Sequence, residues 1–103
     1  MSQIANVSIE TTGNVYFDGK CVSFTFFTAD GVRKSVGVIL PASLTFGTAA
    51  PEVMELQQGR CRVRMAGYDS WQEYAGGQSF AVGANTSFDI EVLEATHYVC
   101  HYG

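Results

Sequence analysis

Arg60, Arg62 and Arg64 alternate with apolar residues in the segment from Arg60 to Met65. The two-residue period of a β-strand would place the three arginines on one face and the apolar side chains on the other. Guanidinium groups bind phosphate and carboxylate oxygens through paired N–H donors, so this face is a candidate anion site. The structural alternative is a solvated face on which the arginines pair with Asp and Glu of neighbouring strands.

Further cationic residues follow two turn signals. Lys20 follows Asp18-Gly19, and Arg33-Lys34 follow the turn at Asp30-Gly31. Such residues commonly carry the solvated charge of a hairpin. Phosphate binding is the other role open to them, because each presents a cation beside a turn.

One carboxylate stands at the start of a predicted strand. Glu52 follows Pro51 directly and lies near Thr48 in the sequence. A glutamate there could hold sugar hydroxyls or act as a base. The structural alternative is a surface glutamate beside a turn.

Aromatic and histidine side chains add two further possibilities. Trp71, Tyr74 and Phe88 could stack on a flat ligand, although core packing is an alternative role for large rings. His97 and His101 are four residues apart and share a strand face, but no cysteine or carboxylate stands at a convincing metal-ligand spacing. A glycine-rich phosphate loop and a nucleophile elbow are absent from the sequence. No metal site is therefore predicted.

The elements that must position these groups are short β-strands. From Asn14 onward, β-branched and aromatic runs alternate with turn residues, and no segment has a sustained helical period. We therefore predict an all-β single domain of the sandwich or barrel type, with residues 1–13 as a loosely ordered lead-in and 14–103 as the barrel. The predicted strands are 15–17, 22–28, 35–40, 43–48, 53–57, 61–65, 71–74, 79–82, 87–93 and 97–102.

Composition supports one compact cytoplasmic domain. The chain has 103 residues, of which 47% are apolar and 16% charged, enough for one hydrophobic core. The net charge of −4 argues against a surface devoted to nucleic acid. No apolar run is long enough for a membrane span, and the first residues lack the features of a secretory signal. The three cysteines are expected to be buried free thiols in a reducing cytoplasm.

Several segments together resemble a family of small single-domain bacterial cupins, the pyrimidine/purine nucleoside phosphorylases. The resemblance runs from about Asn14 to the end of the chain. It implies a cupin-type jelly-roll barrel, and a homodimer, because open jelly rolls commonly cover their sheet edges by pairing. The segments are Tyr16 to Lys20, Arg33 with Ser35 to Val38, Phe46 to Met54, Trp71 to Tyr74 with Gly77, Phe80 to Val82, Ser87-Phe88 and Tyr98 to Tyr102.

The resemblance to cupins also bears on metal binding. Metal-binding cupins hold their ion through three histidines and one glutamate. Set against that pattern, Glu52 falls on the glutamate, whereas the histidine positions fall on Phe46, Thr48 and Phe88. One carboxylate is too few to hold a transition metal, so we expect no metal and no other cofactor.

The family's activity implies that inorganic phosphate displaces the base of a nucleoside at C1′, giving ribose 1-phosphate and free base. Positive charge develops on the sugar, so a carboxylate stabilises the transition state while a cation positions the phosphate. Stacking tolerates any base, which suits activity on both purines and pyrimidines. The candidates are Glu52 and Thr48 as catalytic groups at the ribose, Arg33 and Lys20 for phosphate with Arg62 or Arg64 as substitutes, and Trp71, Tyr74 or Phe88 for stacking on the base.

Two other functions remain open from the sequence. The first is a non-catalytic module that binds a small anion or metabolite, because a fold alone does not fix function. The second is a metal-dependent, dioxygenase-like cupin, which would contain iron or manganese. Release of base that depends on phosphate distinguishes the enzyme from the binding module.

Overall fold

The computed structural model describes residues 2–103 and builds them almost entirely from β-strands. Met1, which belongs to the predicted lead-in, lies outside the described residues. A single 3-10 turn, η1 (Phe17–Gly19), is the helical segment of this range, so the all-β prediction is confirmed. The strands are β1 (Ser8–Ile9), β2 (Asn14–Tyr16), β3 (Cys21–Phe27), β4 (Arg33–Ile39), β5 (Ala42–Gly47), β6 (Glu52–Met65), β7 (Gln72–Ala75), β8 (Ser79–Val82) and β9 (Ser87–Tyr102).

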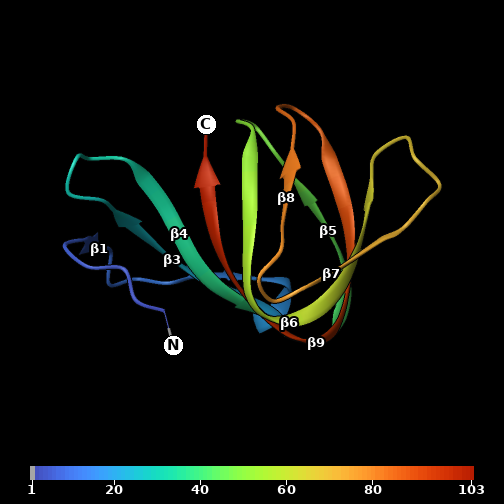
Figure 1. The fold of residues 1–103 in the computed structure, drawn as a ribbon, viewed down its shortest axis with the longest axis horizontal. Coiled ribbons are helices and arrows are strands. Elements are labelled where there is room, and N and C mark those ends of the chain that lie inside the picture. Colours follow the sequence, from blue (N-terminus) through green and yellow to red (C-terminus); the bar gives the residue numbers. More distant parts are fainter. Residues whose placement is uncertain (1) are drawn as a thin grey trace.

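Two long antiparallel strands, β6 and β9, organise the sheet. They pair along their whole length, from Glu52 opposite Tyr102 to Met65 opposite Phe88. Figure 1 shows both strands following one deep curve, so that their two halves face each other. The first half of β6 also pairs with β8 and its second half with β7, while β9 pairs first with β5 and then with β4. The long strands therefore connect the two walls of the fold.

The curve has a local cause at Gly59. Its φ of +104° lies in the left-handed region that favours glycine, and a Cβ there would collide with the backbone of Ala95 and Thr96. The register between β6 and β9 shifts repeatedly from Leu56 to Cys61, which marks β-bulges, and bulges bend and twist a strand. The predicted separation of 53–57 from 61–65, and of 87–93 from 97–102, is therefore wrong. Each pair forms one bent strand.

The sheet is not closed as a barrel, so that part of the fold prediction is wrong. Its main path runs β1-β3-β4-β9-β6-β7, and β5 and β8 each pair with only one strand within residues 2–103. The hairpin of β3 and β4 projects to one side of the curve, together with β1 (Figure 1). Because that hairpin leads away from β5, β7 and β8, no hydrogen-bonded ladder joins the two ends of the path. The fold is an open, strongly curved sheet.

The predicted lead-in makes defined contacts where the structure describes it. Ser8 and Ile9 of β1 pair with Phe27 and Phe26 of β3, and the Glu10 amide donates to the Thr25 carbonyl at 2.9 Å. The boundary between residues 13 and 14 stays a prediction. No helix among residues 2–103 has the length and apolarity to cross a bilayer.

The hydrophobic core fills the concave side of the curve. Alternation along β6 buries Cys61 and Val63 and turns Arg62 and Arg64 outward, as their spacing predicted. All three cysteines are buried and free. The largest fully buried side chains are Ile39, Leu56, Ile90, Val63, Thr96, Cys21 and Cys61.

Gly37 in β4 provides room for a tyrosine. It lies between Ser23 of β3 and Tyr98 of β9 in the register, and a Cβ would stand 2.7 Å from the Val22 carbonyl oxygen and 2.8 Å from the Tyr98 hydroxyl. We expect Gly37→Ala to destabilise the protein by about 1–3 kcal/mol, because buried overpacking forces side chains or backbone to move. Urea unfolding measures the loss.

Gly83→Ala is the matched control for Gly37→Ala. A Cβ at Gly83 has no neighbour within 4 Å, and its φ is not in the left-handed region. Its midpoint in urea should therefore stay close to that of the unaltered protein. Equal stability of the two variants would show that the space at Gly37 is not needed.

Candidate active site

A cavity of about 150 Å³ opens between the two walls of the curved sheet. It is smaller than the roughly 300–1,000 Å³ of pockets that take drug-sized ligands, so it suits a sugar or a phosphate better than a large cofactor. Hydroxyl groups, one carboxylate and two phenyl rings meet in it. The lining residues are Tyr16, Ser23, Ser35, Phe46, Gly47, Glu52, Met54, Phe88, Tyr98, Cys100 and Tyr102.

The register of β4, β9 and β6 places three functional side chains in one row. Tyr102 of β9 is directly opposite Glu52 of β6. On the other side of β9, Ser35 of β4 is opposite Cys100. Arg33 precedes Ser35 by two residues, so it shares the same sheet face and lies beside Tyr102. Side chains directly opposite each other across strands lie about 5 Å apart at Cβ. The row therefore reads Arg33, Tyr102, Glu52.

The Glu52 carboxyl is half-buried at this cavity. Burial raises its pKa above the ordinary value, because desolvation disfavours the charged form. A hydrogen bond from the Cys100 thiol and the positive charge of Arg33 oppose that rise. Burial also raises the pKa of Cys100 to about 12, so this thiol stays protonated near neutral pH and is not a nucleophile.

Arg33 lies over the ring of Tyr102, with its guanidinium carbon 4.2 Å from the ring centroid. This is cation–π geometry. The Tyr102 hydroxyl is itself fixed by a 2.9 Å hydrogen bond with Ser35. Among residues 2–103, neither Arg33 nor Glu52 takes part in an ion pair. Both charges therefore remain available to a ligand.

The opposite side of the cavity is aromatic. Phe46 of β5 and Phe88 of β9 stack with centroids 5.6 Å apart and an angle of 18° between the rings. Phe17 packs edge-on against Phe46 at 5.2 Å, and its φ of +52° is unusual for a bulky residue. Such backbone strain is concentrated at functional sites. Tyr16, Phe46 and Phe88 line the cavity, so this side offers aromatic rings to a ligand.

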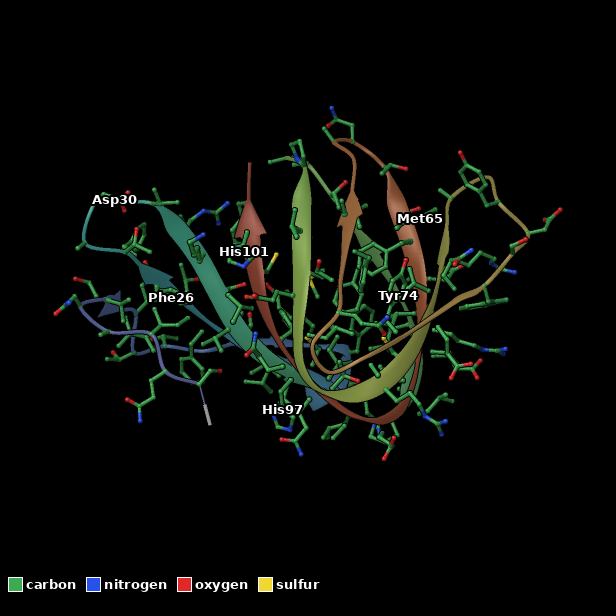
Figure 2. All side chains as sticks on the ribbon, in the orientation of Figure 1. Phe26, Asp30, Met65, Tyr74, His97 and His101 are labelled. Atoms are coloured by element: carbon green, nitrogen blue, oxygen red, sulfur yellow. The ribbon has the colours of Figure 1, made fainter. Side chains whose placement is uncertain are left out.

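Two of the rings predicted to stack on a base lie elsewhere. Trp71 is held between Arg62 and Arg64, whose guanidinium carbons are 4.8 and 4.7 Å from its ring. Tyr74 packs against Phe80 with centroids 5.0 Å apart, inside the curve of the sheet (Figure 2). Neither residue lines the cavity, whereas Phe88 does.

On the arginine face of β6, Arg62 and Arg64 pair with carboxylates of the neighbouring strand, as the structural alternative to an anion site predicted. Arg62 pairs with Glu91 at 3.0 Å, and Arg64 pairs with Asp89 at 2.9 Å. Both carboxylates stand opposite their arginines on β9, and neither arginine lines the cavity. A phosphate at this face would have to compete with two carboxylates already in place.

Thr48 and Lys20 also lie outside the lining of the cavity. The Thr48 hydroxyl donates to the Gly83 carbonyl at 2.7 Å and accepts from the Thr86 amide at 3.2 Å, so it ties two loops together. Lys20 is exposed at the end of η1. The structure thus gathers Glu52, Phe88 and, beside Tyr102, Arg33, and it leaves the other predicted site residues apart from them.

The donor set of the cavity does not resemble a transition-metal centre. Of the four positions that the sequence resemblance set against cupin ligands, Glu52, Phe46 and Phe88 line the cavity, and two of these are phenyl rings. Among residues 2–103, no three His, Cys, Asp or Glu side chains are placed to hold a metal ion. His97 lies outside the curve (Figure 2), and His101 contacts Lys34 at 2.6 Å and Glu55 at 3.2 Å.

Sequence reasoning missed the residues of the terminal strand. Tyr98, Cys100 and Tyr102 share one face of β9 and all line the cavity, as does Ser35. The signal was present, because strict alternation in Tyr98 to Tyr102 puts these three side chains on one side and the histidine on the other. The alternation alone does not show which of the two faces is the concave one.

The protein is thus an open all-β domain whose small cavity holds one carboxylate and a pair of stacked rings, with one guanidinium beside it. A family model described as pyrimidine/purine nucleoside phosphorylase matches residues 11–102. The chain therefore belongs to the pyrimidine/purine nucleoside phosphorylase family.

Individual relatives agree with this membership. Proteins named pyrimidine/purine nucleoside phosphorylase from Cupriavidus metallidurans and Thiobacillus denitrificans are 60% and 62% identical, and each match covers 100% of both chains. A crystal structure of a protein of unknown function from Acinetobacter sp. ADP1 superimposes with a TM-score of 0.95 at 44% identity, covering 98% of each chain. Both the sequence and the fold are thus shared over nearly the whole length.

Proposed function

We propose that the protein is a metal-independent nucleoside phosphorylase, a pentosyltransferase that cleaves purine and pyrimidine nucleosides with inorganic phosphate to ribose 1-phosphate and free base. The observation that carries this proposal is that Glu52 and the Phe46–Phe88 pair line one cavity, while Arg33 lies over the ring of Tyr102, which also lines it. The names of its relatives support the same reaction.

In the proposed reaction, a phosphate oxygen forms a bond to C1′ as the bond from C1′ to the base nitrogen breaks. The electron pair of that bond leaves with the base, and the proton of hydrogen phosphate ends on the base nitrogen, so atoms and charge balance. Positive charge develops on the ribose in the transition state of this exchange. A fixed carboxylate beside the sugar lowers the energy of that state, and a half-buried one does so more strongly than one in water.

The roles follow from where the groups stand. Glu52 faces the ribose from the cavity wall, and Arg33 holds phosphate oxygens through its paired N–H donors. The stacked rings of Phe46 and Phe88 take the base, and stacking accepts any base because each has a π-face. Thr48, Lys20, Arg62, Arg64, Trp71 and Tyr74 are not used in this arrangement.

Phosphate dependence tests the proposal. The purified protein is incubated with uridine or adenosine, with and without inorganic phosphate, and base and ribose 1-phosphate are measured. We expect both products only when phosphate is present. Base release at the same rate without phosphate would mean hydrolysis, and no release from either nucleoside would favour a binding module.

We also propose a cupin-type jelly roll that acts as a homodimer in the cytoplasm. Ile4 and Ile9 of the N-terminal segment and Val36 of β4 line one hollow and are 48%, 54% and 38% exposed. Val53 of β6 is 41% exposed. A second copy would cover such a patch and the open edges of the sheet.

A further inference from the structure

Tyr102 stands between the two charges of the proposed site. Its backbone partner on β6 is Glu52, and Arg33 lies over its ring at 4.2 Å. The ring is held at a second point by the 2.9 Å hydrogen bond between its hydroxyl and Ser35. The cation on β4 and the carboxylate on β6 therefore lie on the two strands that flank β9, with the Tyr102 ring between them.

Without that ring, the two charges would be expected to meet. An arginine side chain readily reaches a carboxylate on the same sheet face, as Arg64 of β6 does on the outer face, where two of its nitrogens donate to Asp89 of β9 at 3.3 and 2.9 Å. Arg33 has the same reach, and only the ring of Tyr102 lies between it and Glu52 across β9. Arg33 already acts on Glu52, since its charge opposes the rise of the Glu52 pKa. A direct ion pair would use the N–H donors of Arg33 and neutralise the charge of Glu52.

We propose that Tyr102 is a positioning residue that keeps Arg33 and Glu52 from pairing, so that the arginine can take phosphate and the carboxylate can face the sugar. This inference rests on the proposed function for its kinetic consequence. Its structural consequence, the separation of the two charges, can be measured without substrate.

The first test is the titration of Glu52, followed by NMR of carboxyl-labelled glutamate in the unaltered protein, Tyr102→Phe and Tyr102→Leu. Phenylalanine keeps the ring, so the Glu52 pKa should stay within a few tenths of a unit. In Tyr102→Leu it should fall by about one unit or more, because an adjacent cation favours the ionised form.

A double variant separates ion pairing from simple hydration. Removing the ring also admits water, which lowers the Glu52 pKa by itself. In Arg33→Gln/Tyr102→Leu the pKa should return toward that of Arg33→Gln alone, because no cation remains to pair. If the fall persists without Arg33, or if Tyr102→Leu leaves the Glu52 pKa unchanged, the inference is overturned.

Kinetics give the second readout. Tyr102→Leu should raise the phosphate KM and lower kcat together, at least tenfold in kcat/KM, whereas Tyr102→Phe should retain activity within about threefold. Circular dichroism melting confirms that both variants fold, and Tyr102→Met replaces the leucine variant if it does not. Equal loss in the phenylalanine and leucine variants would contradict the spacer role. Lack of phosphorolysis in the unaltered protein would defeat the proposed function while leaving the titration result valid.

Discussion

Glu52→Gln is expected to lower kcat for base release about a hundredfold or more, with little change in melting temperature. Removing one preorganised group that stabilises transition-state charge typically costs that much. Glutamine keeps the shape and hydrogen-bonding reach of the side chain and removes its charge. The measurement is initial-rate kinetics with uridine at saturating phosphate, alongside thermal melting.

Glu55→Gln is the control for Glu52→Gln. Glu55 lies on the same strand but on its outer face, where it contacts His101 at 3.2 Å. Its kinetics should match those of the unaltered protein. Unchanged kinetics in Glu52→Gln would remove Glu52 from the site.

The pH profile tests the same carboxylate in another way. Burial raises the Glu52 pKa above 4.5, so the charged form that stabilises the sugar is lost as pH falls through this raised value. Activity should therefore decline on the acid side at a higher pH than an exposed glutamate would give. In Glu52→Gln this limb should disappear from the profile of the residual activity.

The sequence predicted the faces of the strands better than their lengths. Alternation in Arg60 to Met65 placed the arginines outward and Cys61 and Val63 in the core, and both placements are confirmed. The predicted strands 53–57 and 61–65 leave Gly59 between them, because glycine is common in turns. In the structure it is a bulge in a continuous strand, since partner strands on both sides support the ladder through the bend.

The cavity could be predicted only in part for a similar reason. Glu52 and Phe88 stand in segments that the family resemblance covers, and both line the cavity. Ser35, Cys100 and Tyr102 come from two other strands, and their meeting depends on the register of β4 with β9 and β9 with β6. Register over such sequence distances is a tertiary property, set by packing of the concave face rather than by local spacing.

The arginines show how pairing decides between equal candidates. In sequence, Arg33, Arg62 and Arg64 are all candidates to bind phosphate. Arg62 and Arg64 face carboxylates on the next strand, whereas Arg33 faces an aromatic ring. Only the three-dimensional neighbours distinguish an occupied guanidinium from an available one.

Arg33→Gln is accordingly expected to lower kcat/KM for phosphate about a hundredfold, with a smaller effect on the KM for the nucleoside. A guanidinium that binds phosphate through two charge-assisted hydrogen bonds contributes both affinity and orientation, and glutamine supplies neither the charge nor the fork. The matched control is Arg64→Gln, since Arg64 also lies over an aromatic ring but is paired with Asp89 on the outer face. Initial rates over a range of phosphate concentrations should show the loss in Arg33→Gln and near-normal constants in Arg64→Gln. The reverse pattern would indicate that phosphate binds at the arginine face of β6. The comparison is direct, because Arg33→Gln and Arg64→Gln each remove one positive charge, the first beside the cavity and the second on the outer face.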